Sequence, residues 1–498
     1  MNKTNGYTPI SFTGNGRQIE PRSERMWFGV ILIIALAVRM IIFNLVAAHP
    51  LKYYSNSDAY GYEQIALNLL HFGVFSVKSR PPLISDIYRT PIYPTFLAGV
   101  YAVTNQSPSA AIILQILIGG LAAALTYLMS FYLDLPKACG LIAGLIVAFD
   151  PLTVLTTYQL LTEILFSAIL LLGLIFLVAY WNTARLSMLV MASMSLAAAA
   201  LTRPIGQFLP FALLPVFLIV YAKRRQHWRQ SLFRIFLFLL ITLSLIQSWA
   251  YRNYHEANIW TVSAIGEEAL LYYSARDVVA ATHDISKEEA TQELEGYIQN
   301  QINTRNLTKA QSIALVRQKA MEIFRQYPKQ TLIVHLKGLA RVLINPGLDL
   351  ICVMLNQQND PSACAVEDSK DFLSQIAEKF SVMDNFQKVV AIWGIILLLV
   401  VYTGTTLGIW FLIRHHNWFV LILFLTLIAY FSLLSAGGES VSRFRIPFLP
   451  FLGIITGIGL VSTFGYLKRF RNFPINKSSV FRNIFEIYEG IIRKKSNL

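Results

Sequence analysis

The sequence contains few charged residues and very few cysteines. Only 14% of its 498 residues are charged and 3 are cysteine, whereas 55% are hydrophobic. Soluble domains usually carry about 25% charged residues, and disulfide scaffolds need a dense set of cysteines. No C-x-x-C pair or similar metal-ligand spacing occurs. The composition therefore excludes an ordinary soluble domain, a disulfide scaffold and a zinc-ribbon type of protein.

Long apolar runs take the place of the missing charges. About 17–25 apolar residues cross the hydrocarbon core of a bilayer as a helix, and runs of that kind recur along the chain. We expect ten crossings, of which Asp150-Pro151 interrupts the third, and the short run Ile92–Thr104 would change the count if it also entered the membrane. The crossings are expected at about 27–48, 109–132, 138–159, 161–181, 186–201, 206–222, 232–250, 388–413, 418–436 and 446–466. The predicted fold class is an all-α polytopic membrane protein.

The net charge of +14 is explained by topology and does not indicate a nucleic-acid partner. Lys and Arg gather in short loops and tails, as expected of cytoplasmic segments. With the N-terminus inside, two long segments, 49–108 and 251–387, lie outside. The predicted organisation is a cytoplasmic tail, a membrane module containing the first external loop, a mainly helical external domain, further membrane helices and a basic cytoplasmic tail, at 1–26, 27–250, 251–387, 388–466 and 467–498.

Both outer segments contain recognisable helix signals. In the first, apolar residues at helical spacing between Ser57 and Gly73 predict a short surface helix, with Ser57 as N-cap, Asp58 in the first turn and Gly73 as the stop. In the second, the stretches Ser286–Glu289 and Thr308–Gln311 fit the capping-box pattern. Cys352 and Cys364 share this outer segment, where a disulfide would persist, and two free thiols are the alternative.

Several ionisable residues lie inside or at the ends of apolar runs, where lipid contact is costly. Arg89 stands in a proline-flanked segment, Ile87–Pro94, that the two prolines keep from forming a regular helix. Asp58 has the alternative of merely complementing its helix dipole, and Arg89 of reaching the lipid headgroups. The remaining ionisable residues of this kind are Arg39, Glu163, Arg203, Arg252, Glu439, Arg443 and Arg445. Except for Arg39, the predicted topology places them near the outer boundary, as a site for a phosphate beside a hydroxyl would require.

In order and spacing, these motifs resemble the C-type (GT-C) polyprenyl-phosphate-sugar-dependent glycosyltransferases. The resemblance is to family 39, the group of the protein O-mannosyltransferases and of the bacterial transferase that adds aminoarabinose to lipid A. It covers about Trp27 to Tyr466. The residues that carry it are the Asp58 helix, Arg89-x-Pro-x-Tyr-Pro, Leu161-Thr162-Glu163, Thr202-Arg203-Pro204, Trp249-x-x-Arg252-Asn253 and Arg443-Phe444-Arg445-Ile446-Pro447.

The resemblance implies a GT-C-like helix bundle with juxtamembrane helices outside the membrane, and a site whose residues have defined roles. Asp58 would be the catalytic base and Glu163 a second acid of the site. No cofactor or metal is required, although a divalent cation is compatible. Basic residues around the cavity would bind the donor phosphate, and the candidates are Arg89, Arg203, Arg252, Arg443 and Arg445.

The reaction implied is inverting transfer of a sugar from a polyprenyl-phosphate donor to a hydroxyl of a glycolipid, surface polysaccharide or protein. It would take place on the extracytoplasmic face of a bacterial inner membrane. Protein O-mannosyltransferases have two adjacent acids in the first loop, whereas Asp58 is followed by Ala59. That difference, and the lack of a large inserted sugar-binding domain, favours a glycolipid or polysaccharide acceptor.

Two other classes remain open at this stage. Intramembrane charges also occur in secondary transporters, although we find no repeated halves in the sequence. A ligase or polymerase that uses diphosphate-linked glycans would share the topology, and its donor would carry one more phosphate. Replacement of Asp58 separates an enzyme from a non-enzymatic scaffold, which would tolerate the change.

Overall fold

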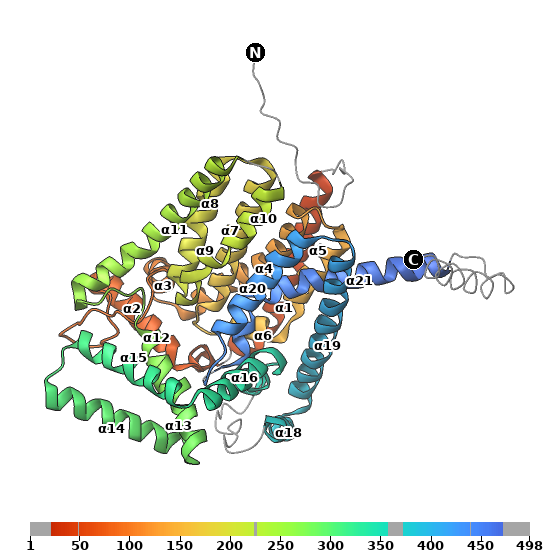
Figure 1. Ribbon diagram of the computed structural model, residues 1–498. Helices are drawn as coiled ribbons and strands as arrows, with labels where there is room; N and C mark the ends of the chain where they lie inside the picture. The colour runs from red at the N-terminus through yellow and green to blue at the C-terminus, as the bar shows by residue number, and fades with distance from the viewer. Residues whose placement is uncertain (1–20, 48, 224–226, 357–371, 439, 472–498) are drawn as a thin grey trace, which may run out of the picture.

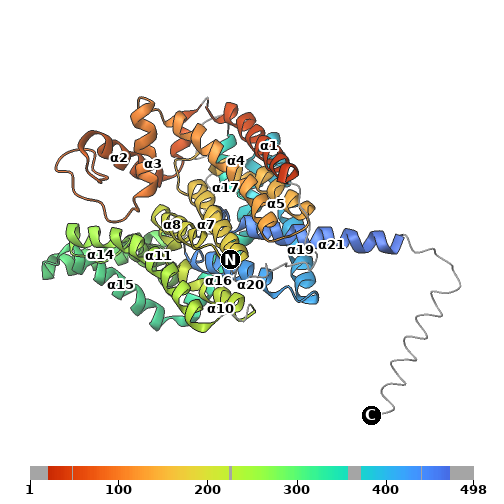
Figure 2. The same cartoon turned by 90° about the horizontal axis from the view of Figure 1, so that it is seen from above.

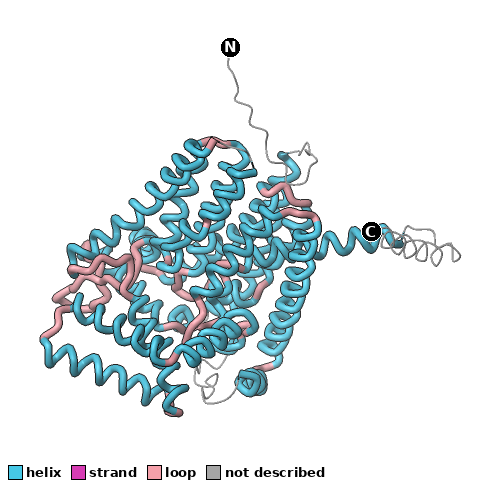
Figure 3. The backbone as a smooth tube through the Cα atoms, in the orientation of Figure 1, coloured by secondary structure: helices cyan, strands magenta, loops and turns pink. Residues whose placement is uncertain are grey.

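A computed structural model describes residues 21–47, 49–223, 227–356, 372–438 and 440–471. Every regular element within these ranges is a helix, as predicted (Figure 1). Figure 3 shows that the loops gather mainly on the side of the bundle where α2 (Ser57–Phe72) and α12 (Ile265–Ala269) lie. The core is therefore made by packing helix on helix.

Within the described residues, six helical stretches are long and apolar enough to cross a membrane. The bent pair α16 (Pro328–Ile344) and α17 (Leu348–Leu355), at 54° to each other, would make a seventh if it counted as one span. Further apolar helices of 10–17 residues are α3 (Ile92–Val103), α5 (Lys137–Phe149), α8 (Leu186–Thr202), α20 (Trp418–Leu434) and part of α21 (Leu449–Arg471). The six long stretches are α1 (Pro21–Ala47), α4 (Pro108–Tyr132), α7 (Glu163–Thr183), Pro204–Lys223, α11 (Trp228–Ala257) and α19 (Asn385–Arg414). The prediction of a polytopic helical membrane protein is thus confirmed.

Two predicted crossings are not single straight helices. The third, 138–159, ends as α5 at Phe149, and the buried six-residue helix α6 (Pro151–Thr156) follows. Asp150 separates the two helices because its carboxylate accepts the Thr153 amide at 2.8 Å, which caps α6, and Pro151 has no backbone N–H with which to continue α5. The sixth crossing is divided into η2 (Pro204–Phe208), α9 (Leu209–Ala212) and α10 (Leu214–Lys223).

The predicted surface helix is α2, which follows the short helix η1 (Pro50–Tyr54). Its N-cap is Asn56, whose side chain accepts the Asp58 amide, so the prediction of Ser57 as the cap was wrong by one residue. Asn and Ser cap equally well, and local sequence does not choose between them. Gly73 ends the helix in the left-handed conformation at φ 66°, as predicted.

A set of helices from α12 to α16, here called the helical layer (Ile265–Ile344), follows α11 in the chain. It lies along the lower edge of the molecule in Figure 1, and Figure 2 shows α14 and α15 from above. Between its first and last members are η3 (Leu270–Ala275), α13 (Arg276–His283), α14 (Lys287–Arg305) and α15 (Lys309–Gln326). Both predicted capping boxes are present, at Ser286 and Thr308. The layer has a hydrophobic cluster of its own, which includes Leu271, Val278, Leu294, Val316 and Ile323. It is therefore a packed unit and not a loose loop.

After the helical layer the chain passes through α17, which carries Cys352, and resumes at α18 (Phe372–Val382). Cys364 lies outside the described residues, so the predicted disulfide stays a prediction, and Glu439 lies outside them too. Most of α21 is packed in the core, and its C-terminal end extends away from the remaining helices (Figure 1).

Candidate active site

Asp58 and Arg89, 31 positions apart in sequence, form an ion pair. Arg89 Nη2 lies 3.2 Å from Asp58 Oδ1, and the two side chains are 17% and 37% exposed. Asp58 is in the first turn of α2, where a carboxylate is favoured by the helix dipole. Its exposure leaves the carboxylate open to a substrate hydroxyl while one oxygen remains in contact with Arg89.

The loop that carries Arg89 is held at both ends. Asp86 Oδ1 accepts the backbone amides of Tyr88 at 3.1 Å and of Arg89 at 2.8 Å. On the other side the Thr90 hydroxyl donates to the Thr202 carbonyl at 3.0 Å. The second bond joins this loop to the end of α8, directly before Arg203. The backbone position of Arg89 is thereby tied to that of another predicted site residue.

Gly61 and Tyr62 of α2 contact the Arg89 side chain, and the sequence analysis identified neither of them. A Cβ at Gly61 would lie 2.6 Å from Arg89 Nη2 and 2.7 Å from Cζ, so the guanidinium rests against the helix backbone. The Tyr62 ring centroid is 5.3 Å from Arg89 Cζ. Gly61 and Tyr62 follow Asp58 by three and four residues, which puts all three on one helix face. That spacing was the available signal.

Glu163 is the second centre of charge. It is the first residue of α7, its side chain is 2% exposed, and its Oε1 is 2.7 Å from Arg203 Nη1 and 3.2 Å from Arg443 Nε. Arg203 follows α8 and Arg443 lies in η5 (Ser442–Arg445). Cζ of Arg203 lies 5.0 Å and Cζ of Arg443 lies 5.7 Å from the centroid of the Phe444 ring. Because a buried carboxylate needs charged partners, Glu163 fixes both arginines.

The two centres of charge lie next to each other. Tyr62 interacts electrostatically with Asp58, Arg89, Arg203 and Glu163, and Arg203 also interacts with Asp58. Burial, followed by the nearby Asp58 charge, raises the pKa of Tyr62 to about 12, so its hydroxyl stays protonated and able to donate. Three guanidinium groups face two carboxylates here, which leaves one positive charge in excess.

Arg252 lies apart from these ion pairs. Its Nη1 donates to the Asp86 carbonyl at 2.6 Å, and its guanidinium is 4.8 Å from the Trp249 ring centroid and 5.3 Å from that of Phe75. It supports the loop that carries Arg89 through Asp86. This places Arg252 behind the site, where its contacts differ from those expected of a phosphate ligand.

Arg445 makes its hydrogen bonds to backbone carbonyls and takes no part in these ion pairs. Its side chain is 1% exposed, and Nη1 donates to the carbonyls of Val342, Leu343 and Asn345 at 3.0–3.1 Å. These carbonyls belong to the C-terminal end of α16, which a cation stabilises. Arg39 has a comparable place at the end of α5, where Nη1 donates to the Ala148 carbonyl at 3.4 Å. Both geometries are those of residues that support the fold.

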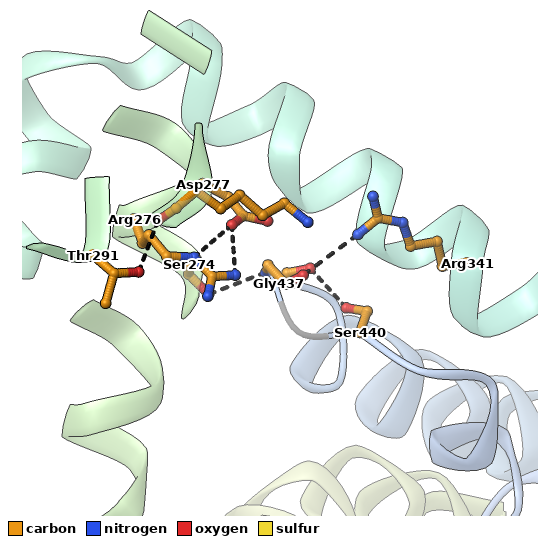
Figure 4. Close-up of polar contacts among 9 residues, drawn as sticks. Ser274, Arg276, Asp277, Thr291, Arg341, Gly437 and Ser440 are labelled. Atoms are coloured by element: carbon orange, nitrogen blue, oxygen red, sulfur yellow. Dashed lines mark hydrogen bonds and ion pairs between the residues drawn. The ribbon is translucent and has the colours of Figure 1, made fainter. Parts of the chain in front are cut away.

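The turn before Arg443 is held by the helical layer (Figure 4). The Gly438 amide donates to Ser274 Oγ at 3.4 Å, and Arg341 Nη1 donates to the Gly438 carbonyl at the same distance. A Cβ at Gly438 would lie 2.1 Å from the Tyr273 carbonyl oxygen, so only glycine fits. The helical layer therefore contacts the segment that leads into Arg443.

Within the described ranges, no group of three or more His, Cys, Asp or Glu side chains is arranged to hold a metal ion. The residues that gather at the site are instead arginines and single carboxylates. A guanidinium presents N–H donors in a fixed plane that suits phosphate oxygens. The arrangement can bind an oxyanion beside an accessible carboxylate.

The structure shows a polytopic helical membrane protein with an arginine-rich centre, and part of its sequence matches a known family. Residues 88–251 match the sequence profile of the family described as dolichyl-phosphate-mannose-protein mannosyltransferase. This segment contains Arg89, Glu163 and Arg203. Over this segment the match agrees with the resemblance predicted from the sequence. Among curated proteins, no sequence matches the chain.

Solved structures with a distant likeness to this chain include two membrane proteins. One is the archaeal oligosaccharyltransferase AglB from Archaeoglobus fulgidus, in complex with an inhibitory peptide and a dolichol-phosphate, with 13% identity, TM-score 0.48 and coverage of 94% of this chain and 54% of that one. The other is ArnT from Cupriavidus metallidurans bound to undecaprenyl phosphate, with 13% identity, TM-score 0.40 and coverage of 88% and 79%. The chain spans about half the length of the archaeal enzyme. TM-scores below 0.5 support no inference about the site.

Proposed function

We propose that this protein transfers a sugar from a polyprenyl-phosphate donor to an acceptor hydroxyl, with inversion at the anomeric carbon. The observation that carries the proposal is an accessible carboxylate, Asp58, which pairs with Arg89 and interacts with Arg203. Arg203 in turn shares the buried Glu163 carboxylate with Arg443. A base and a phosphate-binding group must both reach the anomeric centre in such a reaction.

The three arginines would bind the donor phosphate and stabilise the charge that grows on it. Their net excess of one positive charge favours an anion. Glu163 is engaged by two of these arginines and is almost fully buried. Its role would be to orient Arg203 and Arg443, because a carboxylate so enclosed has no open path to an acceptor. Fixed cations of this kind need no reorganisation when the reaction occurs.

Asp58 would act as the general base. It would take the proton of the acceptor hydroxyl while that oxygen forms a bond to the anomeric carbon and the bond from this carbon to the phosphate oxygen breaks. The products would be the glycosylated acceptor, a protonated Asp58 and a polyprenyl phosphate. The second ionisation of a phosphate monoester lies near pH 6, so this leaving group needs no proton from the protein.

The acceptor and the location are part of the proposal. Extracytoplasmic transfer to a glycolipid or surface polysaccharide in a bacterial inner membrane agrees with the lysine and arginine distribution and with Ala59 following Asp58. The family that residues 88–251 match is described as a protein mannosyltransferase, so a protein acceptor belongs in the same assay. No cofactor enters this mechanism, and a divalent cation remains compatible with it.

The test is glycosyl transfer in membranes that contain wild type, Asp58→Asn or the control Asp284→Asn at matched expression. Asp284 is exposed and caps α13 in the left-handed conformation, which Asn tolerates. Asp58→Asn should lower transfer about 10²–10⁴-fold, as expected for loss of a general base, while the control keeps it. Normal transfer by Asp58→Asn would end the assignment, and use of diphosphate-linked donors alone would favour a ligase or polymerase.

A further inference from the structure

Helix α16, the last member of the helical layer, has two faces of different character. One face packs inside the protein, because Val334, Gly338 and Val342, spaced four residues apart, are buried. The other face is apolar although it is exposed. It consists of four residues, each at least 41% exposed: Leu332, Ile333, Leu336 and Ile344. An exposed apolar face on a helix that packs by its other side is typical of helices that lie against lipid.

The C-terminal end of α16 contacts the interior of a membrane span. In α19 no charged residue occurs for 25 positions after Lys388. Tyr402, 14 positions after Lys388, donates its hydroxyl to the Leu343 carbonyl. A Cβ at Gly394, 6 positions after Lys388, would lie 3.5 Å from Pro346. At a rise of about 1.5 Å per residue, these contacts are about 9 Å and about 21 Å from Lys388 along the helix. The end of α16 therefore lies at a level where lipid surrounds the bundle.

The backbone groups that are freed at the break between α16 and α17 are bonded to protein. Arg445 Nη1 donates to three carbonyls at the end of α16, at 3.0–3.1 Å. The Asn345 side chain accepts the amides of Gly347 at 2.8 Å and of Leu348 at 3.3 Å. At membrane depth no water replaces such bonds, so irregular backbone is tolerated only where the protein satisfies it. The break meets this requirement.

The pair of helices stays on the side of the bundle where α19 begins. Gln387, in the first turn of α19, donates to a carbonyl of α17 at 3.1 Å. Lys52, in η1 directly after the span α1, donates to the carbonyl of Asn356 at 2.7 Å. At the other end α16 follows α15, whose Ile313 packs against the loop that carries Arg89. The pair therefore enters the membrane and leaves it on one side.

We propose that α16 lies in the leaflet where α19 begins, with its exposed apolar face against lipid acyl chains. The predicted topology makes this the outer leaflet. Lys329 and Lys337 are exposed on α16, and lysines at such a boundary extend to lipid phosphates while their stems cover apolar surface. The placement does not depend on the proposed reaction. It has a consequence for the site, because Arg341 of α16 binds the turn that leads into Arg443, so the lipid contact fixes the depth of that turn.

Photo-cross-linking of the full-length protein tests the placement. Benzoylphenylalanine replaces Leu336 on α16, Phe236 on the span α11 or Gln292 on α14, all of which are exposed. The protein is irradiated in nanodiscs of phosphatidylethanolamine and phosphatidylglycerol, and the peptides are weighed. Positions 336 and 236 should gain the mass of a lipid, and position 292 should not. A lipid adduct at 236 without one at 336 would overturn the proposal, as would a cross-link from 336 to protein.

A charge substitution gives a second readout. Leu336→Glu should lower the melting temperature in these nanodiscs, because its carboxylate would face acyl chains. Gln292→Glu introduces the same group on α14 and should leave the melting temperature unchanged, as exposed substitutions usually do. Wild-type melting of Leu336→Glu would contradict the placement. Both measurements are made without a sugar donor, so a protein that transfers no sugar refutes the proposed function alone.

Discussion

Replacing Gly61 by alanine should separate stability from activity. A glycine inside a helix costs about 0.5–1 kcal/mol relative to alanine, so alanine at this position of α2 would ordinarily stabilise the chain. Here the new Cβ would lie 2.6, 2.7 and 2.9 Å from Nη2, Cζ and Nε of Arg89. To restore an ordinary contact of about 3.4 Å, the guanidinium must move by about 0.8 Å, and displacements near 1 Å at a site cost about 10²-fold in rate.

We therefore expect Gly61→Ala to lower kcat/KM for transfer by roughly tenfold to a hundredfold without lowering the melting temperature. Gly99→Ala is the matched control, because Gly99 lies within α3 and a Cβ there meets no atom within 4 Å. Transfer rates and thermal unfolding are measured on both variants in the same lipid.

A second comparison tests the cause of the loss. Lysine at position 89 lacks the planar guanidinium that the new Cβ would meet, so adding Gly61→Ala to Arg89→Lys should cost no further activity. The reasoning is refuted if Gly61→Ala transfers as wild type does, or if it lowers transfer equally in the Arg89→Lys background.

Three further predictions concern charge and one concerns close packing. Glu163→Gln should cost about 3 kcal/mol of stability and about 10²-fold in transfer, because two arginines lose their buried partner; unchanged transfer would contradict its orienting role. Arg445→Ala should destabilise the fold by about 3 kcal/mol through three lost carbonyl bonds, while undecaprenyl phosphate binding by the folded fraction persists, as calorimetry and titration would show. Gly438→Ala should cost about 1–3 kcal/mol, because the Tyr273 carbonyl must yield, and a wild-type melting temperature would refute this. Burial raises the pKa of Glu268, on α12, above the ordinary 4.5, so the folded chain binds this proton more tightly than the unfolded chain does. The stabilisation from this proton is therefore present below pH 4.5 and decreases as the pH rises through the folded-state pKa. The measurement is the difference in unfolding free energy between wild type and Glu268→Gln from about pH 4 to about pH 7.

Sequence patterns selected the candidate site residues without showing which of them lie together. Asp58, Arg89, Glu163, Arg203 and Arg443 stood out because charge is rare in this chain and costly near lipid. The same reasoning selected Arg252 and Arg445, whose contacts are with backbone carbonyls and aromatic rings. The scarcity of charged residues indicates that each one makes specific contacts, but it does not distinguish a phosphate ligand from a residue that caps a helix.

The sequence by itself determined the local features of this protein: its apolar helices, the capping boxes at Ser286 and Thr308 and the end of α2 at Gly73. Each depends on residues within a few positions of one another, so composition and spacing suffice. Only the tertiary structure decided that Glu163 joins Arg203 to Arg443, and that Gly61 lies under the Arg89 guanidinium. Such contacts arise when helices distant in sequence pack together, and a guanidinium reaches whichever carboxylate or carbonyl that packing brings within hydrogen-bonding distance.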